Sequence, residues 1–241
     1  MTPPVPERFA LFLDFDGTLV DITDRPDGVL VADGLQSIIE KVVDRADGAV
    51  AVVTGRKVAD VDTFLAMPIA AAGMHGLERR PKPGAGIDHA PPPEEIATLR
   101  DRIQAWDGLG DGVSMEDKGA GLAIHYRAAP GREDEVKAQM KDWAEDLQTL
   151  HLIHGKMVVE AKGKGFDKGV AVDAFMENPP FAGRTPIFIG DDTTDEDGMR
   201  AAQAAGGFGI KVGEGETCAK YRLPDVPSVH DWLRNIAEGL S

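Results

Sequence analysis

Short apolar runs alternate with amphipathic stretches at both ends of the chain. Five of the runs are continuous, which is typical of strands covered on both faces of a parallel sheet. They are RFALFLDFDG (8–17), GAVAVVTGR (48–56), PIAAAG (68–73), TPIFIGDD (185–192) and GGFGIKVG (206–213). Between the first two runs, apolar residues follow helical spacing from Leu35 to Ala46. Apolar strands that alternate with helices predict right-handed crossovers and an α/β fold with a Rossmann-like, five-stranded parallel core.

The middle of the chain has a different pattern. The segment KPGAGIDHAPPPEE (82–95) is rich in proline and glycine, which indicates a connection. After it the pattern predicts a helix, two strands, a second helix and two more strands. In GLAIHYR (121–127) apolar and polar residues alternate, so one face of that strand should be buried. We therefore predict a small α+β domain, residues 80–163, inserted into a core formed by residues 1–79 and 164–241.

The charge balance narrows the range of partners. The 241 residues include 26 basic and 41 acidic side chains, which gives a net charge of −15 at pH 7. This charge argues against nucleic acid or an anionic membrane surface as a partner and leaves a small molecule as the expectation. An anionic substrate would need a metal ion or a local basic pocket. We expect a monomer.

The single cysteine, the lengths of the apolar runs and the first residues of the chain indicate the cellular compartment. The single cysteine, Cys218, excludes an internal disulfide and fits a reducing environment; no motif surrounds it, so we expect a packing residue rather than a nucleophile. No apolar run approaches the roughly 20 residues of a membrane span. The start, MTPPVPERFALFLDF, lacks the basic residues and the long apolar core of a signal peptide. A cytoplasmic location is the default expectation.

Chemically active side chains stand where the predicted strands end. The first strand ends at Asp14 and Asp16, the second at Thr54 and Arg56, and the fourth at Asp191 and Asp192, and Lys168 precedes the helix that leads to the fourth strand. Each motif alone could be a turn, a helix start or a solvated loop. Ligands bind at the carboxyl ends of parallel strands, so all four motifs should converge at one edge of the sheet. Three carboxylates suit Mg²⁺, which prefers oxygen ligands, and the threonine and lysine could then hold a phosphate.

These motifs resemble a known group. DFDGT, TGR, DKG and GDDTTDE match, in order, the four motifs of the haloacid dehalogenase superfamily of phosphatases, and the insertion is similar to the larger (C2) type of cap domain in that superfamily. The segments GMHGLERR, EDKGAGLAIHYR, VVEAKGKGFDKG and GRTPIFIGDDTTDE resemble the trehalose-6-phosphate phosphatase family. The similarity runs from about residue 8 to residue 235 and covers both predicted domains.

The resemblance implies a mechanism with an aspartyl-phosphate intermediate. Asp14 would attack phosphorus, and Asp16 would protonate the leaving oxygen and then act as base for water. Mg²⁺ would be held by Asp14, the backbone carbonyl of Asp16, and Asp191, while Thr54 and Lys168 bind phosphate oxygens. The resemblance implies supporting roles for Thr18, Asp192 and Asp195.

The resemblance also implies the substrate, trehalose 6-phosphate. Glu116, Lys118 and Glu160 match the family residues that hydrogen-bond glucose hydroxyls, although from the residues alone they could equally form a charged surface. Arg56 and His75 are further candidates for binding the substrate. The polar residues His125 and Arg127 could line the substrate site or brace the sheet of the inserted domain.

Three alternatives stay open at this point. The first is the same chemistry on another sugar phosphate, such as mannosyl-3-phosphoglycerate. The second is a receiver-like phosphorylatable switch, which uses a similar set of residues but is about half this length and has no counterpart of Asp16 and no cap. The third is a pseudo-enzyme that binds a sugar phosphate, which the filled catalytic positions disfavour.

Overall fold

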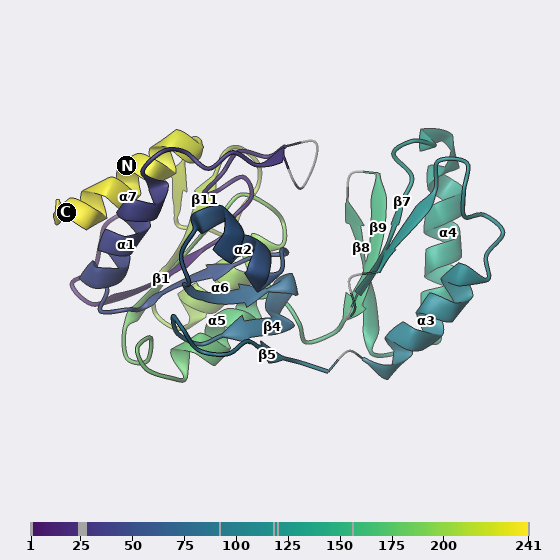
Figure 1. Cartoon of the computed structure of the whole chain (residues 1–241), viewed down its shortest axis with the longest axis horizontal. Helices are drawn as coiled ribbons and strands as arrows, with labels where there is room; N and C mark the ends of the chain where they lie inside the picture. Colours follow the sequence, from purple (N-terminus) through teal and green to yellow (C-terminus); the bar gives the residue numbers. More distant parts are fainter. Residues whose placement is uncertain are drawn as a thin grey trace. The chain divides into compact units, whose positions relative to one another are not determined.

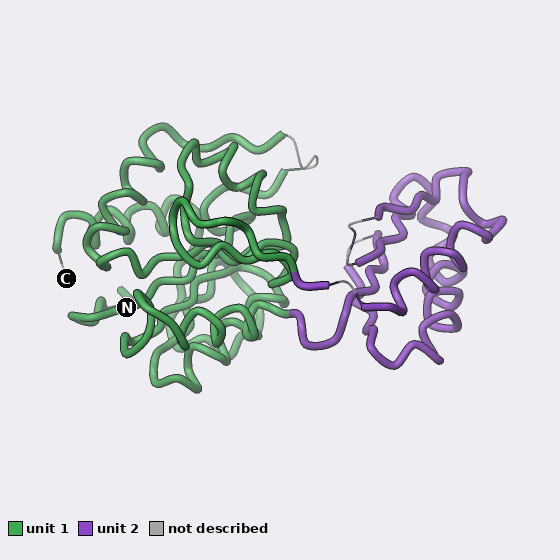
Figure 2. The backbone as a smooth tube through the Cα atoms, turned by 60° about the horizontal axis from the view of Figure 1, so that its bottom comes forward, with its two compact units in different colours: residues 1–89, 167–241 green, residues 90–166 purple. Residues whose placement is uncertain are grey.

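The computed structural model describes residues 2–23, 28–91, 93–117, 119, 121–155 and 157–240. The chain forms two compact units, unit 1 (residues 1–89 and 167–241) and unit 2 (residues 90–166) (Figure 2). The predicted inserted domain began at residue 80, whereas in the structure residues 80–89 belong to unit 1. The reason is that β5 (Asp88–His89) pairs with β4 (Glu78–Arg80) at the edge of the large sheet.

Among the described residues, the sheet of unit 1 contains eight strands in the order β12-β11-β10-β1-β2-β3-β4-β5. Figure 1 labels β1, β4, β5 and β11 of this sheet. The five strands predicted from the sequence are all present and parallel: β1 (Phe9–Leu13), β2 (Val50–Val53), β3 (Ala70–Gly73), β10 (Thr185–Gly190) and β11 (Phe208–Val212). The expected number of strands was too low. A sixth parallel strand, β12 (Tyr221–Leu223), extends one edge, and β4 and β5 extend the other edge in antiparallel orientation. These three strands are two or three residues long and mostly polar, so no apolar run marks them.

In the part of unit 1 that the structure describes, five α-helices accompany this sheet: α1 (Leu35–Arg45), α2 (Val58–Leu65), α5 (Lys168–Met176), α6 (Asp195–Ala204) and α7 (Val226–Glu238). Helix α1 packs beside α7, and α5 packs beside α6. Helix α7 was not among the predicted elements, although its buried residues recur at helical spacing from Val226 to Ile236. Its start is capped by the Asp225 side chain, which accepts a hydrogen bond from the Ser228 N–H at 2.9 Å.

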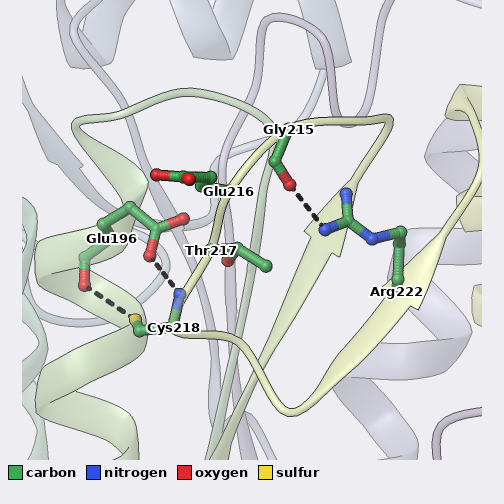
Figure 3. Close-up of a pocket in the computed structure, with 6 residues that line it drawn as sticks. All are labelled: Glu196, Gly215, Glu216, Thr217, Cys218 and Arg222. Carbon is green, nitrogen blue, oxygen red and sulfur yellow. Dashed lines mark hydrogen bonds between the residues drawn. The ribbon is translucent and has the colours of Figure 1, made fainter.

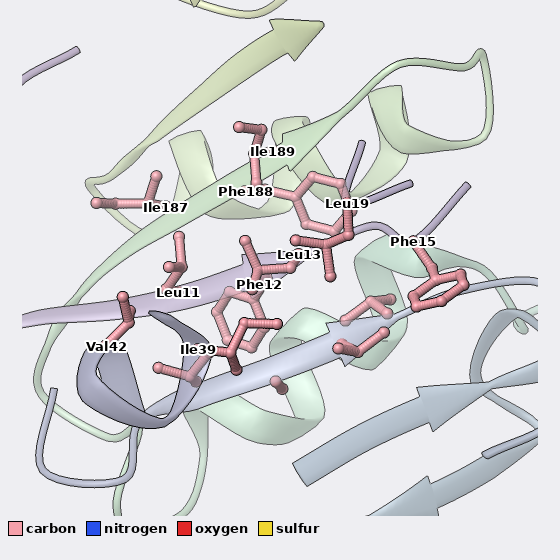
Figure 4. Close-up of a cluster of buried hydrophobic side chains, with 14 of the residues drawn as sticks. Leu11, Phe12, Leu13, Phe15, Leu19, Ile39, Val42, Ile187, Phe188 and Ile189 are labelled. Atoms are coloured by element: carbon pink, nitrogen blue, oxygen red, sulfur yellow. The ribbon is translucent and has the colours of Figure 1, made fainter. Parts of the chain in front are cut away.

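The core of unit 1 explains the continuous apolar runs. All five residues of β1 are buried, because the strand lies between β10 and β2 and has side chains packed on both faces. Figure 4 shows buried side chains of β1, β10 and α1 that belong to this core, among them Phe12 and Ile39. The strand that leads into the candidate site is therefore held rigidly from every side.

Unit 2 is a four-stranded antiparallel sheet in the order β6-β7-β9-β8 with two helices. Its elements follow the predicted order: α3 (Glu94–Gln104), β6 (Ser114–Asp117), β7 (Gly121–His125), α4 (Glu133–Ala144), β8 (Leu150–Gly155) and β9 (Val158–Gly163). The helices bury their apolar faces against alternate residues of the sheet, among them Leu122 and Ile124. The other face of the sheet is left for polar residues. In the described part of the chain, no helix is both long enough and apolar enough to span a bilayer.

Candidate active site

The end of β1 places Asp14 in the interior of unit 1. The backbone N–H of Asp14 still donates to the Ile189 carbonyl of β10 (3.0 Å), and the residue is only 4% exposed. The chain then turns at Gly17, whose φ is +78°. A Cβ atom there would lie 2.2 Å from Asp191 Oδ2, so only glycine lets this turn rest on the Asp191 carboxylate. Two acids from opposite ends of the chain are thus brought together.

A buried ion network surrounds Asp14. Lys168, the first residue of α5 and 3% exposed, donates from Nζ to Asp14 Oδ1 and to Asp195 Oδ1, both at 2.6 Å. The Thr18 hydroxyl donates to the other Asp14 oxygen at 3.2 Å. Burial lowers the pKa of Lys168, but the two carboxylates outweigh that effect and raise the pKa well above its usual value. The lysine therefore stays charged and fixes both acids.

Asp195, at the start of α6, organises the loop that follows β10. It is fully buried, and its Oδ2 accepts the backbone N–H groups of Asp191 (3.0 Å) and Asp192 (2.9 Å). With Oδ1 bound to Lys168, both carboxylate oxygens of Asp195 have partners. Asp195 therefore shapes the loop that presents Asp191.

Three carboxylates gather at this point. One oxygen each from Asp14, Asp191 and Asp195 lie within 4.8 Å of one another. Burial and then repulsion from Asp195 raise the pKa of Asp14 well above its usual value; burial followed by Asp195 and Asp192 raises the pKa of Asp191 to about 6. Ionised acids this close require compensation by a cation. The donor atoms are all oxygen, and the turn at Gly17 leaves room for the Asp191 carboxylate, which fits a small divalent metal ion.

A residue of β11 that supports this loop was missed in the sequence. Lys211 on β11 is buried and donates from Nζ to the backbone carbonyl of Asp191. Both backbone polar groups of Asp191 are therefore bonded: the N–H donates to the Asp195 carboxylate, and the carbonyl accepts from the Lys211 ammonium group. A signal was present, because Lys211 interrupts the otherwise apolar strand FGIKV.

Thr54 and Arg56 follow β2 and lie beside the first motif. Thr54 is buried, and its Oγ1 accepts the Arg56 backbone N–H at 3.2 Å. The Arg56 guanidinium donates from Nε and Nη2 to the two oxygens of Asp16, at 2.6 and 2.7 Å. The hydrogen bond to Asp16 raises the pKa of Arg56. The side chain of Arg56 thus engages an acid of the protein itself.

His75 belongs to the same neighbourhood. It lies in a short 3₁₀ turn after β3 with φ +56°, and its N–H donates to the Thr54 carbonyl at 3.0 Å. A Cβ atom on Gly55 would come within 2.9 Å of His75 Nε2, so the imidazole lies against the backbone of the second motif. The structure brings together the predicted residues of unit 1: Asp14, Asp16, Thr18, Thr54, Arg56, His75, Lys168, Asp191, Asp192 and Asp195.

The candidates in unit 2 share one face of its sheet. By strand register, Glu116 on β6 and Glu160 on β9 lie on either side of Ala123 of β7. His125 joins the same face, with its Nε2 2.8 Å from Glu116 Oε2. Lys118 lies outside the described residues. Arg127 is exposed at the start of the turn that follows β7.

Figure 3 shows an open surface pocket beside α6, and its lining residues do not include Asp14, Asp191 or Asp195. Glu196 Oε2 accepts the Cys218 backbone N–H at 2.8 Å, which ties the loop after β11 to α6. Cys218 is exposed, so its expected packing role is wrong. Its pKa is raised by partial burial and by Glu196, which favours the unreactive thiol over the thiolate.

Comparisons with known proteins agree with the motifs. The family model described as trehalose-phosphatase matches residues 12–227. Trehalose-6-phosphate phosphatase of Escherichia coli (strain K12) is 39% identical over 99% of this chain and 90% of its own length, and a probable trehalose-phosphate phosphatase of Sinorhizobium fredii is 39% identical over 98% and 88%. The crystal structure of a trehalose-6-phosphate phosphatase related protein matches with a TM-score of 0.76 and 27% identity, over 95% of this chain and 97% of that chain. The chain is a phosphatase that belongs to the trehalose-phosphatase family.

Proposed function

We propose that this protein hydrolyses trehalose 6-phosphate to trehalose and inorganic phosphate, the last step of trehalose biosynthesis. The observation that carries the proposal is the buried Asp14 carboxylate at the end of a central parallel strand, pinned by Lys168 in a chain of this family. A buried acid held this firmly is suited to attack a substrate without reorganisation.

Asp14 is the proposed nucleophile. A carboxylate oxygen of Asp14 forms a bond to phosphorus while the bond from phosphorus to the sugar oxygen breaks, which gives an aspartyl phosphate. Asp16 gives its proton to the departing sugar oxygen. In the second half, Asp16 takes a proton from water, the water oxygen attacks phosphorus, and the Asp14 carboxylate and phosphate are released.

Lys168 and Thr54 are the proposed partners of the phosphate oxygens. Lys168 already bridges two acids and can donate a third hydrogen bond from its ammonium group. Thr18 orients the second oxygen of Asp14, and Asp195 and Asp192 shape the loop that carries Asp191.

Mg²⁺ is the proposed cofactor, held by the carboxylates of Asp14 and Asp191 and by the backbone carbonyl of Asp16. When bound, it neutralises the charge of the acids and of the phosphate, which would otherwise repel each other. Asp195 is not a proposed ligand, because both of its oxygens are already engaged.

The proposed sugar-binding residues of unit 2 are Glu116 and Glu160, and Lys118 belongs to the same motif as Glu116. Their support is the shared face of Glu116 and Glu160 on the unit 2 sheet. Fixed polar groups of this kind favour a substrate rich in hydroxyls and reject analogues that leave them unpaired. The net charge of −15 supports a small-molecule substrate rather than nucleic acid or a membrane. A monomer and a cytoplasmic location stay predictions.

The test is phosphate release from trehalose 6-phosphate with Mg²⁺ and with EDTA. Glucose 6-phosphate and mannosyl-3-phosphoglycerate serve as competing substrates in parallel. We expect Mg²⁺-dependent turnover that strongly favours trehalose 6-phosphate. Faster turnover of mannosyl-3-phosphoglycerate would keep the chemistry and overturn the substrate.

A further inference from the structure

Arg56 is held to Asp16 by two bonds of good geometry. The Nε and Nη2 atoms donate to Asp16 Oδ2 and Oδ1 at 2.6 and 2.7 Å, so both oxygens of the carboxylate are engaged by one planar group. A bidentate fork of this kind fixes the plane and the direction of a carboxylate, which a lysine ammonium cannot do.

The guanidinium is itself held in place. Its Cζ lies 5.6 Å from the ring centroid of Phe15 and 5.1 Å from that of Phe64, and these two rings contact each other at 5.7 Å. The backbone of Arg56 is bonded on both sides: its N–H donates to Thr54 Oγ1, and its carbonyl accepts the Met74 N–H at 2.8 Å. Arg56 is thus a rigid support.

Asp16 is the less constrained partner. The Asp16 side chain is 37% exposed and that of Arg56 is 14% exposed. Asp16 also follows a buried strand by three residues and precedes the glycine turn, so its backbone alone does not dictate where its carboxylate points. A partly exposed acid that must meet a leaving oxygen and later a water needs an external restraint.

We infer that Arg56 is a positioning residue: it holds the carboxylate of Asp16 in the orientation needed for proton transfer, instead of binding the substrate directly. Each carboxylate oxygen has a second lone pair, so the fork leaves acceptor capacity for the reacting proton. The inference rests on the proposed role of Asp16 as acid and base, and it gives Arg56 a different role from the substrate-binding one expected from the sequence.

The experiment compares Arg56→Lys and Arg56→Met with the wild type on two substrates. On trehalose 6-phosphate we expect kcat to fall about tenfold to a hundredfold, because a charged hydrogen bond to Asp16 is lost. KM should change less than about threefold, because no hydrogen bond to the substrate is lost. On p-nitrophenyl phosphate the leaving group departs without a proton, whereas breakdown of the aspartyl phosphate still needs Asp16. Stopped-flow should therefore show a burst of about one p-nitrophenolate per enzyme followed by slow turnover.

Three controls separate this role from others. Asp16→Asn should give the same burst, and the double variant Asp16→Asn with Arg56→Lys should be no slower than Asp16→Asn alone. Arg80→Lys breaks another bidentate fork of unit 1, the one between Arg80 and Asp62. It should lower the melting temperature and leave the time course of p-nitrophenolate release the same as that of the wild type.

The overturning results are equally specific. A rise in KM and in the inhibition constant of inorganic phosphate, without a burst, would make Arg56 a phosphate ligand. Additive losses in the double variant would show that Arg56 does not act through Asp16. Because the burst uses an aryl phosphate, it still supports the positioning role if trehalose 6-phosphate proves not to be the substrate.

Discussion

The ion network around Asp14 in unit 1 and the Glu116–His125 pair of unit 2 differ in how far their charged side chains are exposed. In unit 1, Asp14, Lys168 and Asp195 are at most 4% exposed and bonded to one another. In unit 2, Glu116 and His125 form their pair on an exposed sheet face. A buried network costs desolvation energy and yields a fixed geometry, whereas an exposed pair contributes little to stability and can exchange partners. The difference supports the proposal that unit 1 carries the chemistry and that the polar face of unit 2 contributes to recognition.

The largest expected effect comes from Asp14→Asn. The amide is not a nucleophile and is a poor metal ligand, so phosphate release should fall by more than about a hundredfold. The matched control is Asp173→Asn on the exposed side of α5, which should retain wild-type activity. If Asp14→Asn kept more than about a hundredth of the rate, covalent catalysis by this residue would be wrong.

The next largest effect is expected for Lys168→Met, which tests the stability of the buried network. Removing the cation leaves Asp14 and Asp195 buried without their shared partner, which should cost about 3–5 kcal/mol of unfolding free energy at pH 7 in urea denaturation. Lys137→Met in unit 2 removes a cation from an exposed pair with Glu133 and should leave the midpoint unchanged. Equal losses in the two variants would remove the contrast between the units.

The recognition role of unit 2 is tested by Glu116→Ala and Glu160→Ala. Each should lower kcat/KM for trehalose 6-phosphate about tenfold to a hundredfold, because a hydrogen bond from a sugar to a charged group is lost. Hydrolysis of p-nitrophenyl phosphate should stay within about twofold of wild type, since it has no sugar hydroxyls. Equal losses on both substrates would assign the two acids a structural role.

The smallest effect is a pH-dependent shift in melting temperature. The pKa of Asp191 is raised from 3.8 to about 6 in the folded protein, so the folded state binds this proton more tightly than the unfolded state. The tighter binding of this proton therefore stabilises the folded state below about pH 4, and this stabilisation is lost as the pH rises through about 6. A cation restores the balance, so Mg²⁺ should raise the melting temperature by several degrees at pH 7.5 and far less at pH 5.

Asp191→Asn is the control for this titration. The variant cannot ionise at this position, so the gain from Mg²⁺ should be small at both pH values. A gain in the wild type that is as large at pH 5 as at pH 7.5 would contradict a metal site at Asp191.

Much of the unit 1 site could be predicted from order along the chain. Asp14, Thr54 and Asp191 each follow a buried apolar run, and parallel strands bring their carboxyl ends to the same edge. No such rule predicts which residues a long side chain will bind. The fork between Arg56 and Asp16 joins residues 40 positions apart, and Lys211 reaches Asp191 across neighbouring strands. Their bonds depend on rotamers that only the packed protein selects.

The sequence by itself determined the α/β class, the five central strands, the inserted unit and the set of acids at the strand ends, because hydrophobic period and strand order are local properties of the chain. Only the tertiary structure decided which atoms those acids contact. The Asp195 carboxylate accepts the backbone N–H of Asp191, and the Arg56 guanidinium binds the Asp16 carboxylate. The short polar strands at the sheet edges were settled in the same way. The physical reason is shared: a hydrogen bond between distant residues forms only where burial and sheet register bring a donor and an acceptor within about 3 Å.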